Sequence, residues 1–368
     1  MMNLKRDYPR EGARKSSGVA LFLFVLSILC ISLLKILPDT RNELLRKTMT
    51  EASWIMAEAM KTLNTCRRSI GIPANTNDVN ETGLIGIEHS SITTSIGHLE
   101  AKRTSTNPNF AGLLVVFLNE CGVTAGDVIA VGASGSFPAL IVATLSAAKA
   151  MAVTPLVISS LGASQWGANH PDFHWLEMWN CLAVQSIFSV RPLAVSVGGE
   201  GDVGEDMEEE GRTLVLEEIR KSGIPLISEP DLVQNVQSRM DLYHRGAGEK
   251  EIKAFINVGG SWANMGIDSS VLRVKPGLNR IAGLPPAEKR GMIFTMAAAN
   301  VPVIHLLYVK GLVQRYGLPW DPEPLPKPGE GNLYGSLIKR RESFVLIGAL
   351  YVILSLLVIV FWKRPLFW

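Results

Sequence analysis

The chain has 368 residues, 47% of them hydrophobic, and its formal net charge at pH 7 is +2. This length is too great for one small domain and sufficient for a large buried core. The nearly balanced charge excludes the global positive field that would favour nucleic acid. The cysteines at 30, 66, 121 and 181 are widely spaced, so neither a zinc site nor a disulfide framework is predicted, and the last three resemble small buried hydrophobes.

Two apolar stretches are long enough to cross a bilayer as helices. Residues 18–37 carry one charge, Lys35, near their end, and residues 344–362 carry none. No A-x-A-like cleavage site follows the first stretch, which therefore predicts an uncleaved anchor rather than a signal peptide. We expect transmembrane helices at 18–37 and 344–362, and hence contact with a lipid bilayer.

The positions of basic residues suggest an orientation. The tail at 1–17 and the short tail at 363–368 together hold Lys5, Arg6, Arg10, Arg14, Lys15, Lys363 and Arg364. Basic residues also stand on the other side, at positions 41, 46, 47 and 339–341. Because the first helix usually dominates and large translocated domains count least, both termini are predicted in the cytoplasm. The main domain is then extracytoplasmic.

The segment at 38–75 predicts an amphipathic helix. Its apolar side chains recur at steps of three and four: Leu45, Met49, Ala52, Met56, Ala59 and Leu63. We favour a helix packed on the domain over a short coiled-coil stalk. Gly71 and Pro73 end it.

Short apolar strands alternate with helices through the region 76–320. The expected strands cover 127–131, 155–159, 193–197, 224–227, 254–258 and 301–304, and the expected helices cover 113–121, 138–150, 171–187, 208–222 and 287–299. This alternation predicts an α/β domain with a mainly parallel, Rossmann-like sheet between the two transmembrane helices. Residues 321–343 form a proline-rich linker and juxtamembrane segment.

Four of the strands run into loops of small residues, at 132–136, 160–169, 198–204 and 259–266. Ligands bind beyond the carboxyl ends of parallel strands, so these loops predict one shared cleft. The alternative for any single loop is that glycine simply ends a strand. The expected ligand-binding residues are Lys102, Arg103, Ser134, Gly135, Ser136, Ser164, Gln165, Gly199, Gly201, Gly259, Gly260, Ser261 and Asn264.

The loop GASGS at 132–136 is placed like a nucleophile elbow, between a strand and a helix. Ser136 replaces the last glycine of G-x-S-x-G, and a triad needs a histidine and an acid that one sequence cannot place. We expect the amides of Gly135, Ser136 and Phe137 to stay free for an anion. A catalytic Ser134 is the alternative.

Two further motifs have structural explanations. GEGDVG at 199–204 matches G-x-G-x-x-G, but the acidic residues that follow would repel a dinucleotide, so no cofactor is assigned. Glu200 and Asp202 either meet a cation or form a solvated acidic turn, which we favour. In HPDFH at 170–174, Pro171 starts a helix between the histidines, which favours capping over metal binding. No metal site is expected.

Lys102 and Arg103 stand beside three hydroxyl residues in EAKRTSTNPNF at 100–110. Cations with hydroxyls near a helix start suit carboxylate or phosphate recognition. An exposed polar loop explains the pattern equally well.

The strings LEAKRTSTNPNFAGLLV, VGASGSFPAL, ISSLGASQWGANHPDF and INVGGSWANMG resemble the family of poly-gamma-glutamate system proteins. The resemblance covers most of the middle domain and the first anchor, with Trp262 where a smaller residue is expected. It implies association with bacterial machinery that makes or exports poly-γ-glutamate, an anionic capsule polymer, and with other membrane subunits of that system. It supplies no catalytic residues.

Two functions therefore follow from the sequence. The first is a membrane-anchored accessory component of poly-γ-glutamate synthesis or export with an anion-binding cleft. The second is a membrane-anchored hydrolase or amide-bond transferase acting on that polymer. No Walker A motif occurs, so an ATP-driven ligase is not expected.

Overall fold

The computed structural model describes residues 20–32, 40–73, 75–336 and 341–362. The two predicted tails and parts of the first predicted membrane span, residues 18–19 and 33–37, lie outside these ranges. The chain divides into two compact units, one of Met1–Leu44 with Ile338–Trp368 and one of Leu45–Leu337. We describe each unit by itself.

The larger unit is built around a seven-stranded sheet with the order β4-β3-β2-β1-β5-β7-β6. Its strands are β1 (Val128–Ser134), β2 (Thr154–Ser160), β3 (Ala194–Ser196), β4 (Leu226–Ile227), β5 (Ile252–Val258), β6 (Gly277–Asn279) and β7 (Val303–Leu306). Every pairing is parallel except that of β6 with β7. The prediction of a mainly parallel, Rossmann-like α/β domain is confirmed.

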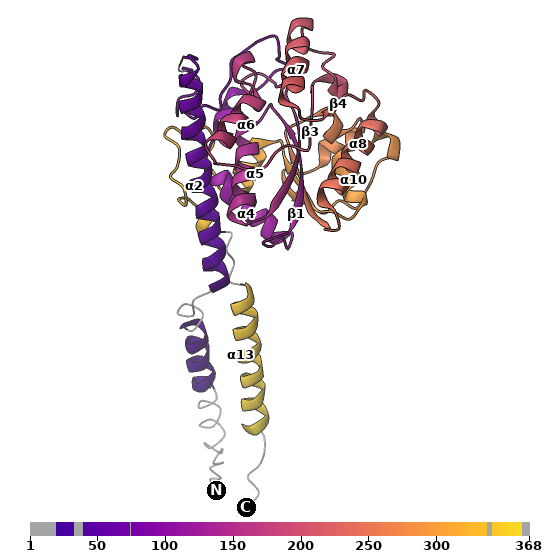
Figure 1. Ribbon diagram of the computed structural model, residues 1–368. Helices are drawn as coiled ribbons and strands as arrows, with labels where there is room; N and C mark the ends of the chain where they lie inside the picture. The colour runs from indigo at the N-terminus through magenta and orange to yellow at the C-terminus, as the bar shows by residue number, and fades with distance from the viewer. Residues whose placement is uncertain (1–19, 33–39, 74, 337–340, 363–368) are drawn as a thin grey trace, which may run out of the picture. The chain divides into compact units, whose positions relative to one another are not determined.

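Helices cover both faces of this sheet (Figure 1), which explains why its strands are continuous apolar runs. The helices of the larger unit are most of α2 (Thr40–Ser69), α3 (Leu99–Ser105), α4 (Asn109–Glu120), α5 (Pro138–Ala150), α6 (Trp175–Val184), α7 (Glu209–Ser222), α8 (Leu232–Ala247), α9 (Trp262–Met265), α10 (Met292–Ala298), α11 (Val309–Tyr316) and α12 (Leu333–Ser336). The helix α13 (Arg341–Trp362) belongs to the smaller unit. All seven residues of β1 are buried.

Alternate residues of the strands enter different clusters. Val128 and Ala130 of β1 pack with side chains of α8 and α10. On another part of the sheet, Val195 of β3 packs with α6 and α7. The sheet is therefore buried on both sides. Because β1, β2, β3 and β5 are parallel, their carboxyl ends lie at the same edge of it.

The helix α2 confirms the predicted apolar stripe. Met49, Ala52, Met56, Ala59 and Leu63 are fully buried, as expected for a helix packed on the domain.

A disulfide joins Cys66 of α2 to Cys181 of α6, across 115 residues of sequence. The prediction of unpaired, buried cysteines is therefore wrong for these two. Their wide spacing in the sequence gave no sign that α2 and α6 meet. Cys121 is free and half-buried.

Residues 321–336, which were predicted as part of a proline-rich linker, belong to the larger unit. The side chain of Asn80 bonds the backbone of Pro322 and Leu325 at 3.0 and 3.2 Å. The Tyr334 hydroxyl lies 2.7 Å from that of Ser53 in α2 and donates to Asn109 at 2.9 Å. Prolines here stiffen a segment that is held in place by hydrogen bonds.

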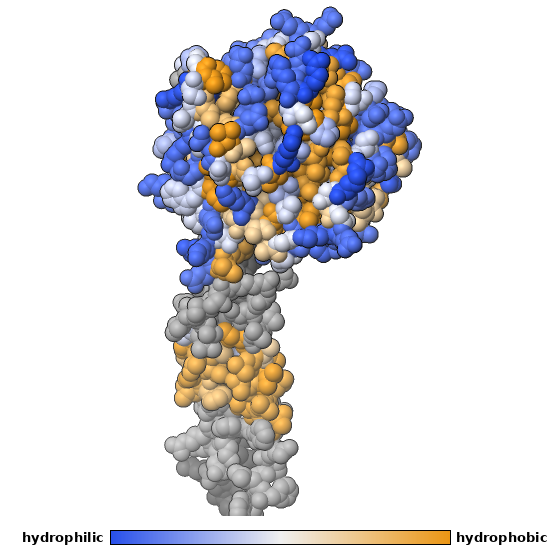
Figure 2. Space-filling view, in the orientation of Figure 1, coloured by the Kyte–Doolittle hydropathy of each residue, from blue (hydrophilic) through white to orange (hydrophobic). Residues whose placement is uncertain are grey.

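In the smaller unit, residues 20–32 and α13 are helical and apolar. The Ser27 hydroxyl donates to the Tyr351 hydroxyl at 3.1 Å, which joins the two helices. Figure 2 shows many of their apolar side chains at the surface, and Leu21, Phe24, Ile353 and Leu356 are more than half exposed. Within the ranges described above, none of the helices combines the length and hydropathy that crossing a bilayer requires.

Candidate functional site

The loops after four parallel strands meet at one edge of the sheet, as predicted. Ser134 ends β1 in register with Ser160 of β2, and Ser160 is in register with Ser196 of β3. On the other side of β1, Ala133 is in register with Val258 of β5. From β1 the chain adds β2, β3 and β4 on one side of the sheet and then β5, β6 and β7 on the other. The switch in strand order therefore lies between β1 and β5. Ligands of open α/β sheets bind at this position.

A cleft of about 940 Å³ opens at this edge. The predicted residues that line it are Lys102, Ser134, Ser136, Ser164, Gly199, Gly260 and Ser261. Those absent from its lining are Arg103, Gly135, Gln165, Gly201, Gly259 and Asn264. All four loops and α3 contribute, so residues distant in sequence share one cavity.

Lys102 is the most unusual group in the cleft because its side chain is a buried cation. It is 3% exposed, and burial lowers the pKa of its ammonium to about 7. Its Nζ donates to the carbonyl of Ser136 and to the Ser164 hydroxyl, the latter at 2.7 Å. Nζ also lies 3.8 Å from the ring centroid of Phe137. Among the described residues, no carboxylate forms an ion pair with it.

Three serines form a hydrogen-bonded series next to Lys102. The Ser134 hydroxyl donates to the Ser136 hydroxyl at 3.0 Å, and the Ser164 amide donates to the same Ser136 oxygen at 3.0 Å. The lysine therefore bonds directly to Ser164, whereas Ser134 is linked to it only through Ser136. No described histidine bonds to Ser134.

The prediction that the loop amides stay free is wrong. The Gly135 amide donates to the carbonyl of Ser160 at 3.0 Å. The Ser136 amide donates to the Ser134 hydroxyl at 3.2 Å, and the Phe137 amide to the Ser134 carbonyl at 3.2 Å. These three amides are satisfied by the turn and by β2, so recognition at this loop falls to side chains.

Several predicted binding residues instead hold the scaffold. Arg103 forms a two-point ion pair with Asp321, with Nε 2.7 Å from Oδ1. The Gln165 side-chain oxygen accepts from the Gly97 amide at 3.2 Å. Both side chains are therefore occupied by protein groups.

Glycines 135 and 259 allow close packing beside the cleft. A Cβ on Gly135 would lie 2.8 Å from the Leu161 carbonyl oxygen. Gly259 has φ +81°, and a Cβ there would lie 3.1 Å from that of Ser134. Neither position tolerates a side chain easily, which accounts for both glycines without a ligand.

In the acidic turn around Gly201, Glu200 is exposed to solvent, as favoured, whereas Asp202 forms a buried ion pair. Asp202 is 1% exposed and accepts from Arg239 at 2.6 Å. Ser196 and Asn235 also donate to its carboxylate, at 2.8 and 3.1 Å. All the strong donors around this acid therefore come from the protein itself, which explains why a charged side chain is tolerated in the core.

Two buried polar side chains near the sheet edge lack partners. Both polar atoms of Asn264 are buried without a hydrogen bond, and a Cβ on Gly132 would lie 2.6 Å from its oxygen. The Ser261 hydroxyl is also buried without a partner, and Ser261 lines the cleft. Ser261 thus offers an unused donor to a ligand.

Sequence reasoning missed His305, which lines the cleft at the end of β7. Its Nδ1 lies 2.9 Å from the Asn257 amide nitrogen, and burial lowers its pKa to about 4, so the ring is neutral at pH 7. The only available signal was its place directly after the last predicted strand, at 301–304. An apolar wall that includes Trp262, Leu307 and Trp320 was also missed.

The HPDFH motif caps a helix start, as favoured. The Nδ1 of His170 accepts from the Asp172 amide at 3.2 Å at the first turn. His174 lies elsewhere, beside Glu177 and Glu218.

Comparison of the chain with family models, curated proteins and solved structures finds no match.

Proposed function

We propose that the chain is a membrane-anchored accessory component of a poly-γ-glutamate synthesis or export system, and that its cleft binds carboxylates of that polymer. The observation that carries the binding proposal is Lys102, a buried cation without an acidic partner in a large cleft. An incoming carboxylate would supply the missing charge and favour the protonated lysine. The assignment to this polymer rests on the sequence resemblance.

The donors around Lys102 support carboxylate recognition. An ammonium has three N–H donors, and two of them reach Ser136 and Ser164, so one is left for a ligand. The Ser261 hydroxyl adds an unused donor in the same cleft. The acids in the lining, Glu100 and Asp206, are solvent-exposed, so their charges are screened.

The rest of the cleft suits an extended chain. Lys310 is exposed and lies 5.6 Å from the ring centroid of Trp320, and both residues line the cleft. A second cation at a distance from Lys102 suits a ligand with repeated carboxylates. The apolar wall suits the methylene groups between them.

Membrane anchoring is proposed from the two apolar stretches of the sequence and is supported by their exposed apolar side chains. The basic tail places the larger unit outside the cytoplasm. The Cys66–Cys181 disulfide supports this orientation, because disulfides persist in oxidising compartments. Gly348, which has open space around it, offers a close-packing position to other membrane subunits.

A second candidate function is hydrolysis or transfer of an amide bond, favoured by the Lys102–Ser164 hydrogen bond. Neutral Lys102 would take the proton of the Ser164 hydroxyl as Oγ attacks the amide carbonyl carbon. The C–N bond would break as the lysine returns the proton to the leaving amine. Water or another amine would then release the acyl group from Ser164.

Binding and cleavage assays on the full chain in detergent test both candidates, with a γ-glutamate oligomer as the probe. Lys102→Met should weaken binding at least tenfold, whereas Lys250→Met, an exposed lysine that bonds the Gly126 carbonyl, should leave it unchanged. Equal affinity in the parent and Lys102→Met would refute the carboxylate-binding proposal. An oligomer of α-linked glutamate with equal charge shows whether the linkage matters.

Ser164→Ala and Ser134→Ala separate accessory from enzyme. If the protein is an accessory component, the parent and both variants all leave the oligomer's length distribution unchanged on prolonged incubation. If the parent shortens or transfers the oligomer and Ser164→Ala stops this while still binding, the second candidate replaces the first.

A further inference from the structure

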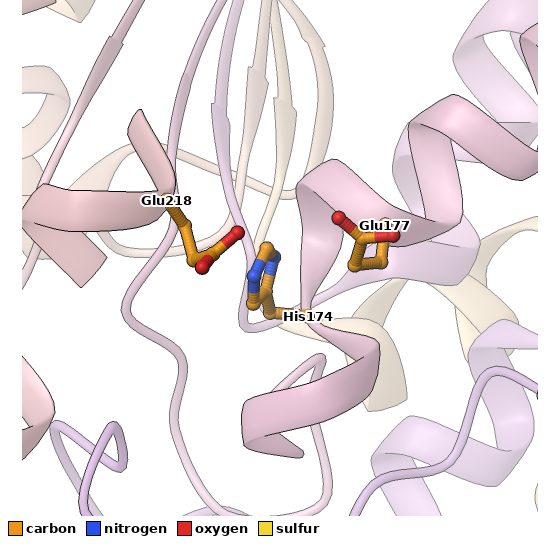
Figure 3. A group of neighbouring side chains, drawn as sticks. All are labelled: His174, Glu177 and Glu218. Atoms are coloured by element: carbon orange, nitrogen blue, oxygen red, sulfur yellow. The ribbon is translucent and has the colours of Figure 1, made fainter. Parts of the chain in front are cut away.

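Three side chains outside the cleft converge between two helices on the same part of the sheet. His174 is the residue just before α6, Glu177 lies in its first turn, and Glu218 lies on α7. One potential ligand atom from each residue lies within 4.8 Å of the other two. Figure 3 shows the imidazole of His174 lying between the two carboxylates.

The histidine is buried and unpartnered. His174 is 1% exposed, and its Nδ1 has no hydrogen-bond partner. Leaving a buried polar atom unpaired costs on the order of 1–3 kcal/mol, so such atoms usually have a function. His174 does not cap α6 through its side chain, unlike His170 at the preceding turn.

The two carboxylates are half-buried and only partly compensated. Lys221 donates to one oxygen of Glu218 at 2.6 Å, but its own side chain is 64% exposed. That ion pair leaves the second Glu218 oxygen available. For Glu177, no ion pair or hydrogen bond of the side chain is found among the described residues. Like charges held this close repel each other unless a cation lies between them.

We propose that His174, Glu177 and Glu218 bind a divalent transition-metal ion, with Zn²⁺ as the expected occupant. One imidazole nitrogen and two carboxylate oxygens match the ligand types of zinc, with water completing a four-coordinate shell. The imidazole argues against Mg²⁺ and Ca²⁺, which prefer oxygen ligands. Bonds of about 2.0–2.2 Å place tetrahedral ligand atoms roughly 3.3–3.6 Å apart. The ligand atoms here lie within 4.8 Å of one another, so the glutamate side chains would move closer on binding.

The role that this placement supports is structural. None of the three residues lines the cleft. The metal would fasten the start of α6 to α7, next to the shared apolar cluster of Leu176, Val215 and Ile219. α6 also carries the disulfide to α2, so the ion would add a second cross-link on the same helix.

The test uses the full chain without a histidine tag, stripped with EDTA and dialysed against ZnCl₂. We expect one zinc per chain by elemental analysis and a rise in melting temperature with zinc concentration. The isosteric variants Glu177→Gln and Glu218→Gln should each lose the bound zinc and the melting shift. The matched control is Glu217→Gln, an exposed neighbour of Glu218 on α7, which should keep both.

Loading with Co²⁺ identifies the ligands, because its visible absorption reports a low-coordinate site and should disappear in both variants. Near-UV circular dichroism confirms that the variants are folded. The proposal is overturned if the stripped parent takes up no zinc. It is equally overturned if Glu177→Gln and Glu218→Gln retain the same zinc as Glu217→Gln, because the ion would then be bound elsewhere.

Discussion

The Nζ atom of Lys102 lies 2.7 Å from the Oγ atom of Ser164, although 62 residues separate the two in sequence. The lysine comes from α3 and the serine from the loop after β2, so the sheet edge and a short helix together make the polar end of the cleft. The pair has no acidic member. The pH dependence of ligand binding and of stability can therefore be predicted from Lys102.

Binding of an anionic oligomer should weaken at alkaline pH. The pKa of Lys102 is about 7, so below pH 7 the lysine is already charged and affinity is level. Above it, binding must take up a proton, and affinity should fall by up to about tenfold per pH unit. Calorimetry in two buffers of different ionisation enthalpy at pH 8 measures this uptake. Lys102→Met should bind weakly at every pH, and a parent that binds equally at pH 6 and pH 9 contradicts the assignment.

The stability of the unliganded chain should increase at alkaline pH, whereas binding of the oligomer weakens there. Burial lowers the folded pKa of Lys102 to about 7 from its ordinary 10.5, so between these values the unfolded chain binds more protons. The free energy of unfolding then rises with pH from 7 to 10.5 and is level below 7 as far as this group contributes. Urea titrations of the parent and Lys102→Met at pH 7 and 9 isolate the effect. The rise should be smaller in the variant, and identical pH profiles would place the lysine in water.

Loss of the Cys66–Cys181 disulfide should destabilise the larger unit by roughly 2–5 kcal/mol, because the bond closes a long loop of the unfolded chain. Denaturation of Cys66→Ser with Cys181→Ser against the parent measures this cost. Mass spectrometry before and after reduction counts the thiols. Cys121→Ser is the control, since that thiol is free and its removal should leave the disulfide intact.

Arg239→Met should destabilise by about 3–5 kcal/mol, because it leaves the Asp202 carboxylate buried without its cation. Adding Asp202→Asn should restore a large part of the loss. As a comparison, Lys61→Met removes the exposed pair with Glu58 and should cost less than about 1 kcal/mol. If the single Arg239 variant is as stable as this surface variant, the buried pair is not structurally important.

The orientation can be measured with a cysteine at Glu249, which is exposed in the turn after α8. An impermeant maleimide should label Glu249→Cys in cells whose outer barrier is open and whose inner membrane is intact. A cysteine in the basic tail, Ser16→Cys, should react only after lysis. The reverse pattern would place the larger unit in the cytoplasm.

The sequence predicted the sheet well because local patterns determine it. Strands β1, β2, β3 and β5 are short apolar runs ending in small residues, and such runs occur where helices cover both faces. The amphipathic helix α8 and the short antiparallel strand β6 were not predicted. The apolar stripe of α8, which includes Leu232, Val236 and Met240, was present in the sequence, whereas β6 has three residues and depends on its pairing with β7.

The candidate site was predicted less well, for an equally physical reason. The loops of Ser134, Ser164 and Ser261 were found because they follow strands. The different roles of Lys102 and Arg103 were not predicted. They depend on Asp321, more than 200 residues away in sequence, which pairs with Arg103 and not with Lys102. The loop amides are not free, because two of the three donate to Ser134 within the turn and the Gly135 amide donates to Ser160 of β2.

The hydrogen bond between Ser53 and Tyr334 has a consequence for engineering. It brings a point near the start of the larger unit beside a point near its end, so the two places where the chain enters and leaves are neighbours. Domains whose ends lie close together usually tolerate insertion into a loop of another protein and circular permutation. We therefore expect the larger unit to tolerate joining of its present ends and opening of new ones in the exposed turn at 248–250.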